Sequence, residues 1–339
     1  MMNALLVALL GCSPDSAPPA DPAPPACGID GTPEWEDPTV FPKDDLLTLA
    51  HLQARGTHNS YHLAPDVLLD ETHAYSHAPI SEQLGALGVR QLELDLHLRD
   101  DGAFDVFHLP GIDPETTCLS LADCLAEICV WSASNPDHVP ALIWMEPKDD
   151  LDAFVEGYQP FAGATAALED EILAFFPRER IYAPDDWKRG EADLGAATAA
   201  LGPPVFGDVR GKVLFALLDS SEHRATYLAE RPDLTGRLLF PDTDGPADTF
   251  AALVKDASAA EMPALLAAGL VVTDHVDGPE LSEAESTASR DALLDAGIQY
   301  ASTDFPAPSD GYWLELPDAD PIRCNPATAP ADCSPGDLE

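Results

Sequence analysis

Basic residues are scarce in this chain of 339 residues, which has 17 Lys and Arg against 60 Asp and Glu and a formal net charge of -43 at pH 7. Proteins that bind nucleic acid neutralise its phosphates with a basic stripe, and the sequence has no such stripe. The shortage of cations also argues against electrostatic attraction to an anionic bilayer. Nucleic acid is therefore excluded as a partner, and a solvated acidic surface is expected.

Long apolar runs and common binding motifs are also missing. Beyond the N-terminus no stretch has the roughly 18 uninterrupted apolar residues of a membrane helix. No G-x-G-x-x-G or P-loop pattern follows the first predicted strand, which argues against a nucleotide-binding open sheet. The cysteines lack the C-x2-C spacing typical of a zinc site. The apolar fraction of 45% is nevertheless that of a folded globular protein.

The N-terminus resembles an export signal. Residues 1–11 form an apolar run too short to span a bilayer, and L-L-G-C ends at Cys12. This resembles a bacterial lipobox, in which Cys12 would carry the lipid that anchors the protein to a membrane. No Lys or Arg precedes the run and Leu10 is bulky for its position, so an ordinary signal peptide or a misassigned start codon stays open. The chain is expected to be exported, as an anchored lipoprotein (periplasmic or at the cell surface) or as a secreted protein.

A proline-rich segment follows. Residues 13–26 cannot form a helix or a ladder, so we predict an extended tether within a lead-in of 12–45, and one folded, monomeric domain over 46–339. Apart from Cys12 there are six cysteines, an even number that predicts up to three disulfides in an oxidising compartment. Cys324–Cys333 is the easiest local bridge, at least one bridge should join distant segments, and Cys27 could attach the tether to the domain.

Strand-like and helical runs alternate along the domain, which indicates βα units. Several strands end in polar residues (T-H-N, E-L-D, M-E-P-K, V-T-D-H and S-T-D), as expected for a (β/α)8 barrel, whose active site is built from the carboxyl ends of its strands. The predicted strands are Leu52–Thr57, Val89–Leu98, Ala103–His108, Val139–Glu146, Lys212–Asp219, Leu238–Pro241, Leu270–Asp274 and Gln299–Asp304. The predicted helices are one that starts at Ser120, Thr165–Phe176, Ala260–Ala268 and Glu283–Ala296.

Carboxylates gather at three of these strand ends. Glu93 and Asp95 are two residues apart, so they point to one face of their strand while the leucines between and beside them point to the other. Buried carboxylates are costly unless a cation compensates them. With Glu146 and the side-chain carbonyl of Asn59 they would form an all-oxygen shell, which suits Ca²⁺ or Mg²⁺.

Two histidines lie beside this cluster. His58 closes the first strand, and His108 closes the short alternating run F-D-V-F-H. Because imidazoles titrate near neutrality, such a pair could exchange protons with a substrate held at a metal ion.

Four motifs in order then resemble a known family. T-H-N-S-Y at 57–61, Q-L-E-L-D-L-H at 91–97, F-D-V-F-H-L-P at 104–110 and M-E-P-K-D at 145–149 are similar to the calcium-dependent, phosphoinositide-specific phospholipases C, in their bacterial single-domain branch. C-L-S-L-A-D-C-L at 118–125 is also similar to that branch, and the resemblance covers roughly residues 50–310. It implies a distorted TIM barrel and cleavage of an inositol phospholipid to diacylglycerol and (cyclic) inositol phosphate.

The resemblance also implies roles. His58 and His108 match the catalytic histidines, Asn59, Glu93, Asp95 and Glu146 match the calcium ligands, and Glu93 is the candidate base for the attacking hydroxyl. The chemistry of phosphodiester cleavage is consistent with these roles, since a bound cation could neutralise charge that develops on the phosphate. Lys148 could contact a substrate phosphate or hydroxyl, or instead pair with Glu146 or Asp149.

Other functions stay open at this point. Glycerophosphodiester phosphodiesterases use the same barrel, an E-x-D pair and two histidines, although their H-R-G and E-N-T segments do not occur here. Sphingomyelinase D-like barrels are a weaker alternative. A surface lipoprotein that binds head groups or calcium without turnover is a third. Asp274, His275, Thr303 and Asp304 could line the pocket, although surface or structural roles are expected for them.

Overall fold

The computed structural model describes residues 27, 35–149, 155–317 and 321–339; the predicted signal, Cys12 and nearly all of the tether lie outside these residues. Eight parallel strands form a barrel, in the order β6-β5-β4-β2-β1-β9-β8-β7. A parallel bridge between Asp242 and Leu253 joins the two ends of this order and nearly closes the barrel. The strands are β1 Leu52–Thr57, β2 Gln91–Leu98, β4 Ala141–Pro147, β5 Val213–Leu217, β6 Leu239–Pro241, β7 Leu253–Lys255, β8 Val271–His275 and β9 Tyr300–Thr303.

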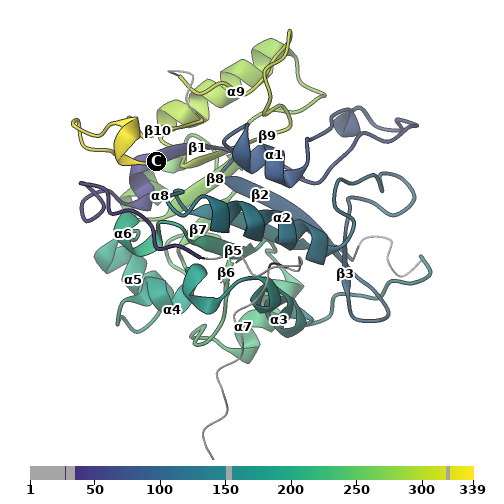
Figure 1. The fold of residues 1–339 in the computed structure, drawn as a ribbon, viewed down its shortest axis with the longest axis horizontal. Coiled ribbons are helices and arrows are strands. Elements are labelled where there is room, and N and C mark those ends of the chain that lie inside the picture. Colours follow the sequence, from purple (N-terminus) through teal and green to yellow (C-terminus); the bar gives the residue numbers. More distant parts are fainter. Residues whose placement is uncertain (1–26, 28–34, 150–154, 318–320) are drawn as a thin grey trace, which may run out of the picture.

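Helices surround the strands: α9 lies along the top of the view in Figure 1, α2 crosses its middle, and α3, α4, α5 and α7 lie in the lower half. α9 begins and ends where its sequence signals predict, because Ser282 and Glu285 form a capping box and Gly297 takes the left-handed conformation (φ 97°) that stops the helix. The α-helices are α1 Ile80–Gly85, α2 Leu121–Ser134, α3 Thr165–Phe175, α4 Pro184–Lys188, α5 Leu194–Leu201, α6 Phe206–Val209, α7 Glu222–Glu230, α8 Met262–Ala267 and α9 Glu283–Ala296. The short 3-10 helices are η1 Leu49–His51, η2 Glu71–His73, η4 Arg178–Arg180 and η5 Pro335–Asp337.

Two further strands, β3 Phe104–Val106 and β10 Ile322–Cys324, pair antiparallel with β2 and β1. The predicted strand Ala103–His108 is therefore shorter than expected and lies outside the barrel. It ends at Val106 because the carbonyl oxygens of the next two residues accept from the ring of His97, at 2.9 and 3.2 Å, instead of from a strand. The barrel strand β7 was not predicted, since three residues carry little periodicity.

The interior of the barrel is where the carboxylates meet. Leu92, Leu94 and Leu96 are fully buried in the hydrophobic core. Glu93 alternates with them and pairs with Lys255 of β7, which is not a neighbour of β2 in the sheet order. A contact between strands so far apart in the order has to cross the barrel interior. The alternation in β2 thus places Glu93 and Asp95 inside, as the sequence predicts.

Three disulfides join the cysteines: Cys27–Cys129, Cys118–Cys124 and Cys324–Cys333. The local bridge at the C-terminus and the attachment of Cys27 to the domain are both as expected. A buried ion pair between Asp44 and Arg210 also ties the lead-in to the barrel. Among the described residues, no helix is long and apolar enough to cross a membrane.

Candidate active site

Three carboxylates from two neighbouring strands meet inside the barrel. Asp95 of β2 lies in register with Glu146 of β4. One oxygen from each of Glu93, Asp95 and Glu146 lies within 4.8 Å of the others. Lys148 Nζ is 2.7 Å from Glu146 and 3.2 Å from Asp95, and Lys255 Nζ is 3.0 Å from Glu93. Two lysines therefore balance part of the negative charge.

The pKa values of Glu146 and Glu93 reflect the negative charge that the two lysines do not balance. Burial, followed by the charge of Asp95, raises the pKa of Glu146 to about 8. Burial opposes ionisation of Glu93 too, but Lys255 and then His58 lower its pKa below the ordinary value. A cluster that holds one carboxyl partly protonated near neutral pH is short of positive charge.

The donor set fits a calcium ion. Oδ1 of Asp95 is buried and has no hydrogen-bond partner within the described part of the chain. Carboxylate oxygens with an unmet demand for positive charge are the ligands that a hard cation prefers, and the buried Asn59 has a side-chain carbonyl of the same oxygen type. Glu93, Asp95, Glu146 and Asn59 are the residues that would hold it.

The turn after β1 brings His58 and Asn59 to this cluster. Asn59 has φ 40°, a left-handed conformation that asparagine tolerates better than most residues. Ser60 holds the turn against β2: its hydroxyl oxygen accepts from the backbone N–H of Glu93 at 2.9 Å and lies 2.7 Å from Thr57 Oγ1. In T-H-N-S the hydroxyls of Thr57 and Ser60 thus build the turn, and His58 between them reaches to 3.9 Å from Glu93.

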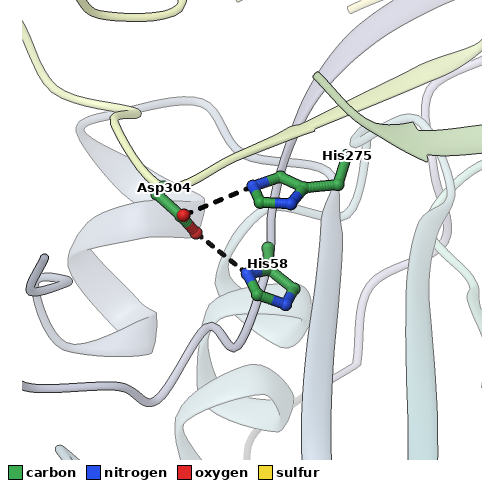
Figure 2. Close-up of side chains that lie close together, drawn as sticks. All are labelled: His58, His275 and Asp304. Atoms are coloured by element: carbon green, nitrogen blue, oxygen red, sulfur yellow. Dashed lines mark hydrogen bonds and ion pairs between the residues drawn. The ribbon is translucent and has the colours of Figure 1, made fainter. Parts of the chain in front are cut away.

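His58 is held by a carboxylate from the end of the neighbouring strand, because β9 pairs in parallel with β1. Its Nδ1 lies 2.9 Å from Oδ1 of Asp304, just after β9, and its Nε2 lies 3.9 Å from Oε1 of Glu93. His275 stacks on the ring of His58 at 4.2 Å and reaches the other oxygen of Asp304 at 3.4 Å (Figure 2). Burial lowers the pKa of His58, but Asp304 outweighs it, so the pKa is raised. The pKa of Asp304 is correspondingly held well below its usual range, against burial, by His275 and His58.

His108 has its own carboxylate. Its Nδ1 lies 2.8 Å from Oδ2 of Asp113, which leaves Nε2 for proton exchange. His62 and His73 surround the same carboxylate. Burial raises the pKa of Asp113, but hydrogen bonds from His108 and His62 overcome this and lower it to about 2. Stacked rings connect the two histidine sites: the ring centroid of Tyr75 lies 4.2 Å from that of His62 and 6.1 Å from that of His58.

A cavity of about 620 Å³ opens beside the carboxylates, at the ends of β4 to β7. Its lining is strongly acidic, and burial raises the pKa of one of its carboxyls, Asp242, to about 7. Its charged lining residues are Glu146, Asp219, Asp242, Asp244, Lys255, Asp256 and Glu261.

The structure thus gathers Glu93, Asp95 and Glu146, with His58 3.9 Å from Glu93, and Lys148 pairs with two of the carboxylates. Asn59 is buried in the turn beside His58, and His108 pairs with Asp113 in a separate cluster. Sequence reasoning missed Asp113 and Lys255, and for Asp304 and His275 it favoured surface or structural roles over a place in the pocket. The S-T-D end of β9 was a signal for Asp304, whereas Asp113 lies in a loop and follows no strand.

Comparisons with known proteins agree with the fold. No curated protein sequence matches the chain. A phosphatidylinositol-specific phospholipase C from Streptomyces antibioticus, titled as Ca²⁺-dependent, superposes with a TM-score of 0.57 and 21% identity over 77% of this chain and 95% of its own. A calcium-dependent phosphoinositol-specific phospholipase C from a Gram-negative Pseudomonas species gives a TM-score of 0.58 at 19% identity, over 86% of this chain and 99% of its own. At such identities the superpositions establish the TIM-barrel fold.

The sequence pattern of one family matches the chain over residues 97–326, about two thirds of its length, and that family is described as phosphoinositide phospholipase C, Ca²⁺-dependent. The matched region contains His108, Glu146 and Asp304 and most of the barrel strands. The chain therefore belongs to the Ca²⁺-dependent phosphoinositide phospholipase C family, as an enzyme that acts on phosphodiesters with calcium as its cofactor.

Proposed function

We propose that the protein cleaves phosphatidylinositol-type lipids into diacylglycerol and (cyclic) inositol phosphate. The observation that supports this proposal best is the pair of histidines, each backed by a buried carboxylate: His58 with Asp304 and His108 with Asp113. His58 also lies 3.9 Å from Glu93 of the carboxylate cluster suited to calcium. Two histidines oriented in this way can accept one proton and donate another during cleavage of a phosphodiester.

Each side chain has a distinct task. His58, whose pKa is raised by Asp304 against the effect of burial, donates a hydrogen bond to a phosphate oxygen. Glu93 accepts the proton of the attacking inositol hydroxyl. His108 Nε2 gives a proton to the departing glycerol oxygen, while Asp113 holds the imidazole through Nδ1. Calcium, when bound, supplies a Lewis acid that neutralises charge developing on the phosphate. Lys148, which pairs with Glu146 and Asp95, contacts a phosphate or hydroxyl of the substrate.

The acidic cavity suits an uncharged polyol. An inositol ring presents hydroxyl groups that donate to carboxylates, whereas an additional phosphate on the ring would meet several negative charges. Lys255 is the cation in the lining, and it is already paired with Glu93. We therefore assign phosphatidylinositol itself as the substrate, in preference to its phosphorylated forms.

Access to the lipid is provided by an apolar loop after β1. Val67, Leu68 and Leu69 are consecutive and exposed, at 70%, 46% and 70%. They precede His73, whose ring contacts His108 at 5.0 Å, so the loop lies at the rim of the site. Exposed apolar clusters of this kind mark interaction surfaces. Insertion into the bilayer, helped by a lipid on Cys12 after export, would offset the repulsion that the acidic surface meets at an anionic membrane.

The test is hydrolysis of phosphatidylinositol in mixed vesicles with calcium and with excess chelator. Diacylglycerol and cyclic inositol phosphate should form with calcium, stop with chelator and form more slowly from phosphatidylinositol bisphosphate. Preferred hydrolysis of soluble glycerophosphoinositol would instead show a glycerophosphodiesterase. If the protein binds calcium but hydrolyses none of these substrates, it is a lipoprotein that binds head groups or calcium without catalysis.

The calcium ligands are tested by calorimetry without substrate. Asp95→Asn and Glu146→Gln should each weaken calcium binding by at least tenfold, because each removes charge from the cluster. Glu82→Gln, at an exposed position of α1, is the matched control and should bind like the unmodified protein. Unchanged affinity in both site variants would place the calcium elsewhere.

A further inference from the structure

Three imidazole nitrogens converge on one oxygen of Asp113. From its Oδ2, Nε2 of His62 lies at 2.8 Å, Nδ1 of His108 at 2.8 Å and Nδ1 of His73 at 3.5 Å. Asp113 and His62 are fully buried, and His73 and His108 keep 11% and 21% of their side-chain exposure. The three histidines come from the turn after β1, from η2 and from the loop after β3, so the fold and not a local motif assembles them.

The hydrogen bonds to Asp113 come from His62 and His108 and do not include Nδ1 of His73. His62 donates to Asp113 through Nε2, and its Nδ1 faces the carbonyl oxygen of Tyr75 at 3.1 Å. His108 donates to the same Oδ2. Nδ1 of His73 is buried and has no hydrogen-bond partner within the described part of the chain, although it points at this carboxylate. Buried polar groups normally have a hydrogen-bond partner, so we expect a ligand to bind this nitrogen.

The spacing and type of the donors identify the ligand. The donor atoms of His73, His108 and Asp113 all lie within 4.8 Å of one another. Ligands at 2.0–2.1 Å from a tetrahedral zinc ion lie about 3.3 Å apart, so shifts of a few tenths of an ångström to about 1.5 Å would close the shell. Two imidazoles and one carboxylate prefer borderline transition ions over calcium.

We propose that His73, His108 and Asp113 form a second metal site, for Zn²⁺ or a similar divalent transition ion, separate from the calcium cluster. His62 stays outside the ligand set. Its N–H orients the carboxylate of Asp113, the usual role of a hydrogen-bond donor behind a metal ligand. The ion displaces the proton on Nδ1 of His108 and takes over the contact between His108 and Asp113.

Occupation of this site regulates the enzyme, a consequence that rests on the function proposed above. A zinc ion on Nδ1 keeps the ring of His108 from becoming an imidazolium, so Nε2 can no longer give a proton to the leaving group as a general acid. Zinc is therefore an inhibitor that acts while calcium remains bound. The site couples activity to the local concentration of transition metal without touching the calcium ligands.

Binding is tested without substrate, so the result holds whether or not the chain is a phospholipase. The protein is titrated with Zn²⁺ against a chromophoric chelator at saturating calcium, and with Co²⁺ to record the visible absorption of a tetrahedral site. One equivalent should bind to the unmodified protein. His73→Asn should lose the absorption and at least tenfold in zinc affinity, whereas His223→Asn, which removes a histidine elsewhere, should lose neither. Failure of the unmodified protein to bind, or equal binding by His73→Asn, overturns the proposal.

Inhibition is tested on the same proteins with calcium saturating. His73→Asn should keep its basal hydrolysis and need at least tenfold more zinc for half-inhibition. His73→Gln, with a similar polar volume, guards against a folding artefact and should behave alike. If zinc inhibits all variants at one concentration, it acts at the calcium cluster and the regulatory role is wrong. If zinc binds but hydrolysis continues at its full rate, the site is structural and the regulatory role is wrong.

Discussion

Asp304 holds His58 by the ring nitrogen that faces away from the carboxylate cluster: Nδ1 of His58 is 2.9 Å from Asp304, and Nε2 is 3.9 Å from Glu93 (Figure 2). The ring is thereby oriented with Nε2 toward Glu93 of the carboxylate cluster. Because Asp304 raises the pKa of His58, the imidazole stays protonated at a higher pH than an ordinary histidine.

Replacement of Asp304 by Asn should therefore change the pH dependence of activity. Without the carboxylate the pKa of His58 falls, so the alkaline limb of the kcat profile should move to lower pH, with a loss of at least tenfold near neutral pH. His275→Asn keeps the Asp304–His58 pair and is the control, with a smaller loss and the same alkaline limb. An Asp304→Asn enzyme with the profile of the unmodified protein would show that Asp304 does not set the charge of His58.

The two histidines should respond differently to the leaving group. Diacylglycerol leaves as a poor alkoxide unless it is protonated, and general acid assistance contributes about 10²- to 10⁴-fold. His108→Ala should lose that factor on phosphatidylinositol yet retain much activity on an inositol nitrophenyl phosphate, whose leaving group needs no proton. His58→Ala should be impaired on both substrates. Equal losses by both variants on both substrates at saturating calcium would remove the acid role of His108.

The apolar loop should matter only at a membrane. Burying one leucine in an apolar phase is worth about 1.5–3 kcal/mol, so Leu68→Ser with Leu69→Ser should cut vesicle hydrolysis by at least tenfold. Hydrolysis of a soluble inositol phosphodiester should not change. Leu201→Ser removes a leucine of α5 that is also 46% exposed and provides the control. A parallel loss on the soluble substrate would mean that the loop shapes the active site and does not bind lipid.

His138 should weaken the fold as the pH falls. Its Nδ1–H donates to the carbonyl of Val139 and its Nε2 accepts from Ser132, an arrangement that a neutral ring satisfies. Burial lowers its pKa to about 4. Between the ordinary pKa of about 6.5 and about 4, the unfolded chain binds a proton that the folded chain does not, so stability falls as the pH is lowered through this window.

Urea unfolding measures this contribution. Between pH 7 and pH 5 the unmodified protein should lose about 2 kcal/mol more than His138→Asn, since one pKa unit is worth about 1.4 kcal/mol. Burial also lowers the pKa of the half-buried His51, so His51→Gln should lose a smaller part of the pH dependence than His138→Asn. If the pH dependence of His138→Asn equals that of the unmodified protein, the buried ring is not what limits acid stability.

Much of this architecture was predictable because it is local. Alternation in β2 places Glu93 and Asp95 on one face, the cap at Ser282 and the stop at Gly297 bound α9, and the polar ends of β1 and β4 mark the mouth of the barrel. Strand and helix periodicity depend on nearby residues only, which is why Leu52–Thr57 and Glu283–Ala296 match their predicted bounds. The motifs around His58, Glu93, His108 and Glu146 also identified the family.

Only the tertiary structure could decide which distant groups meet. Asp304 reaches His58 across 246 positions of sequence, and Lys255 of the unpredicted strand β7 crosses the barrel to Glu93. Asp113 lies in a loop with no periodicity, and its contacts with His62, His73 and His108 depend on how three loops pack. The sequence by itself determined the residue types and the faces on which they lie, because these follow from local backbone geometry. The closure of the barrel determined the partners, because contacts between strand ends depend on the register of the whole sheet.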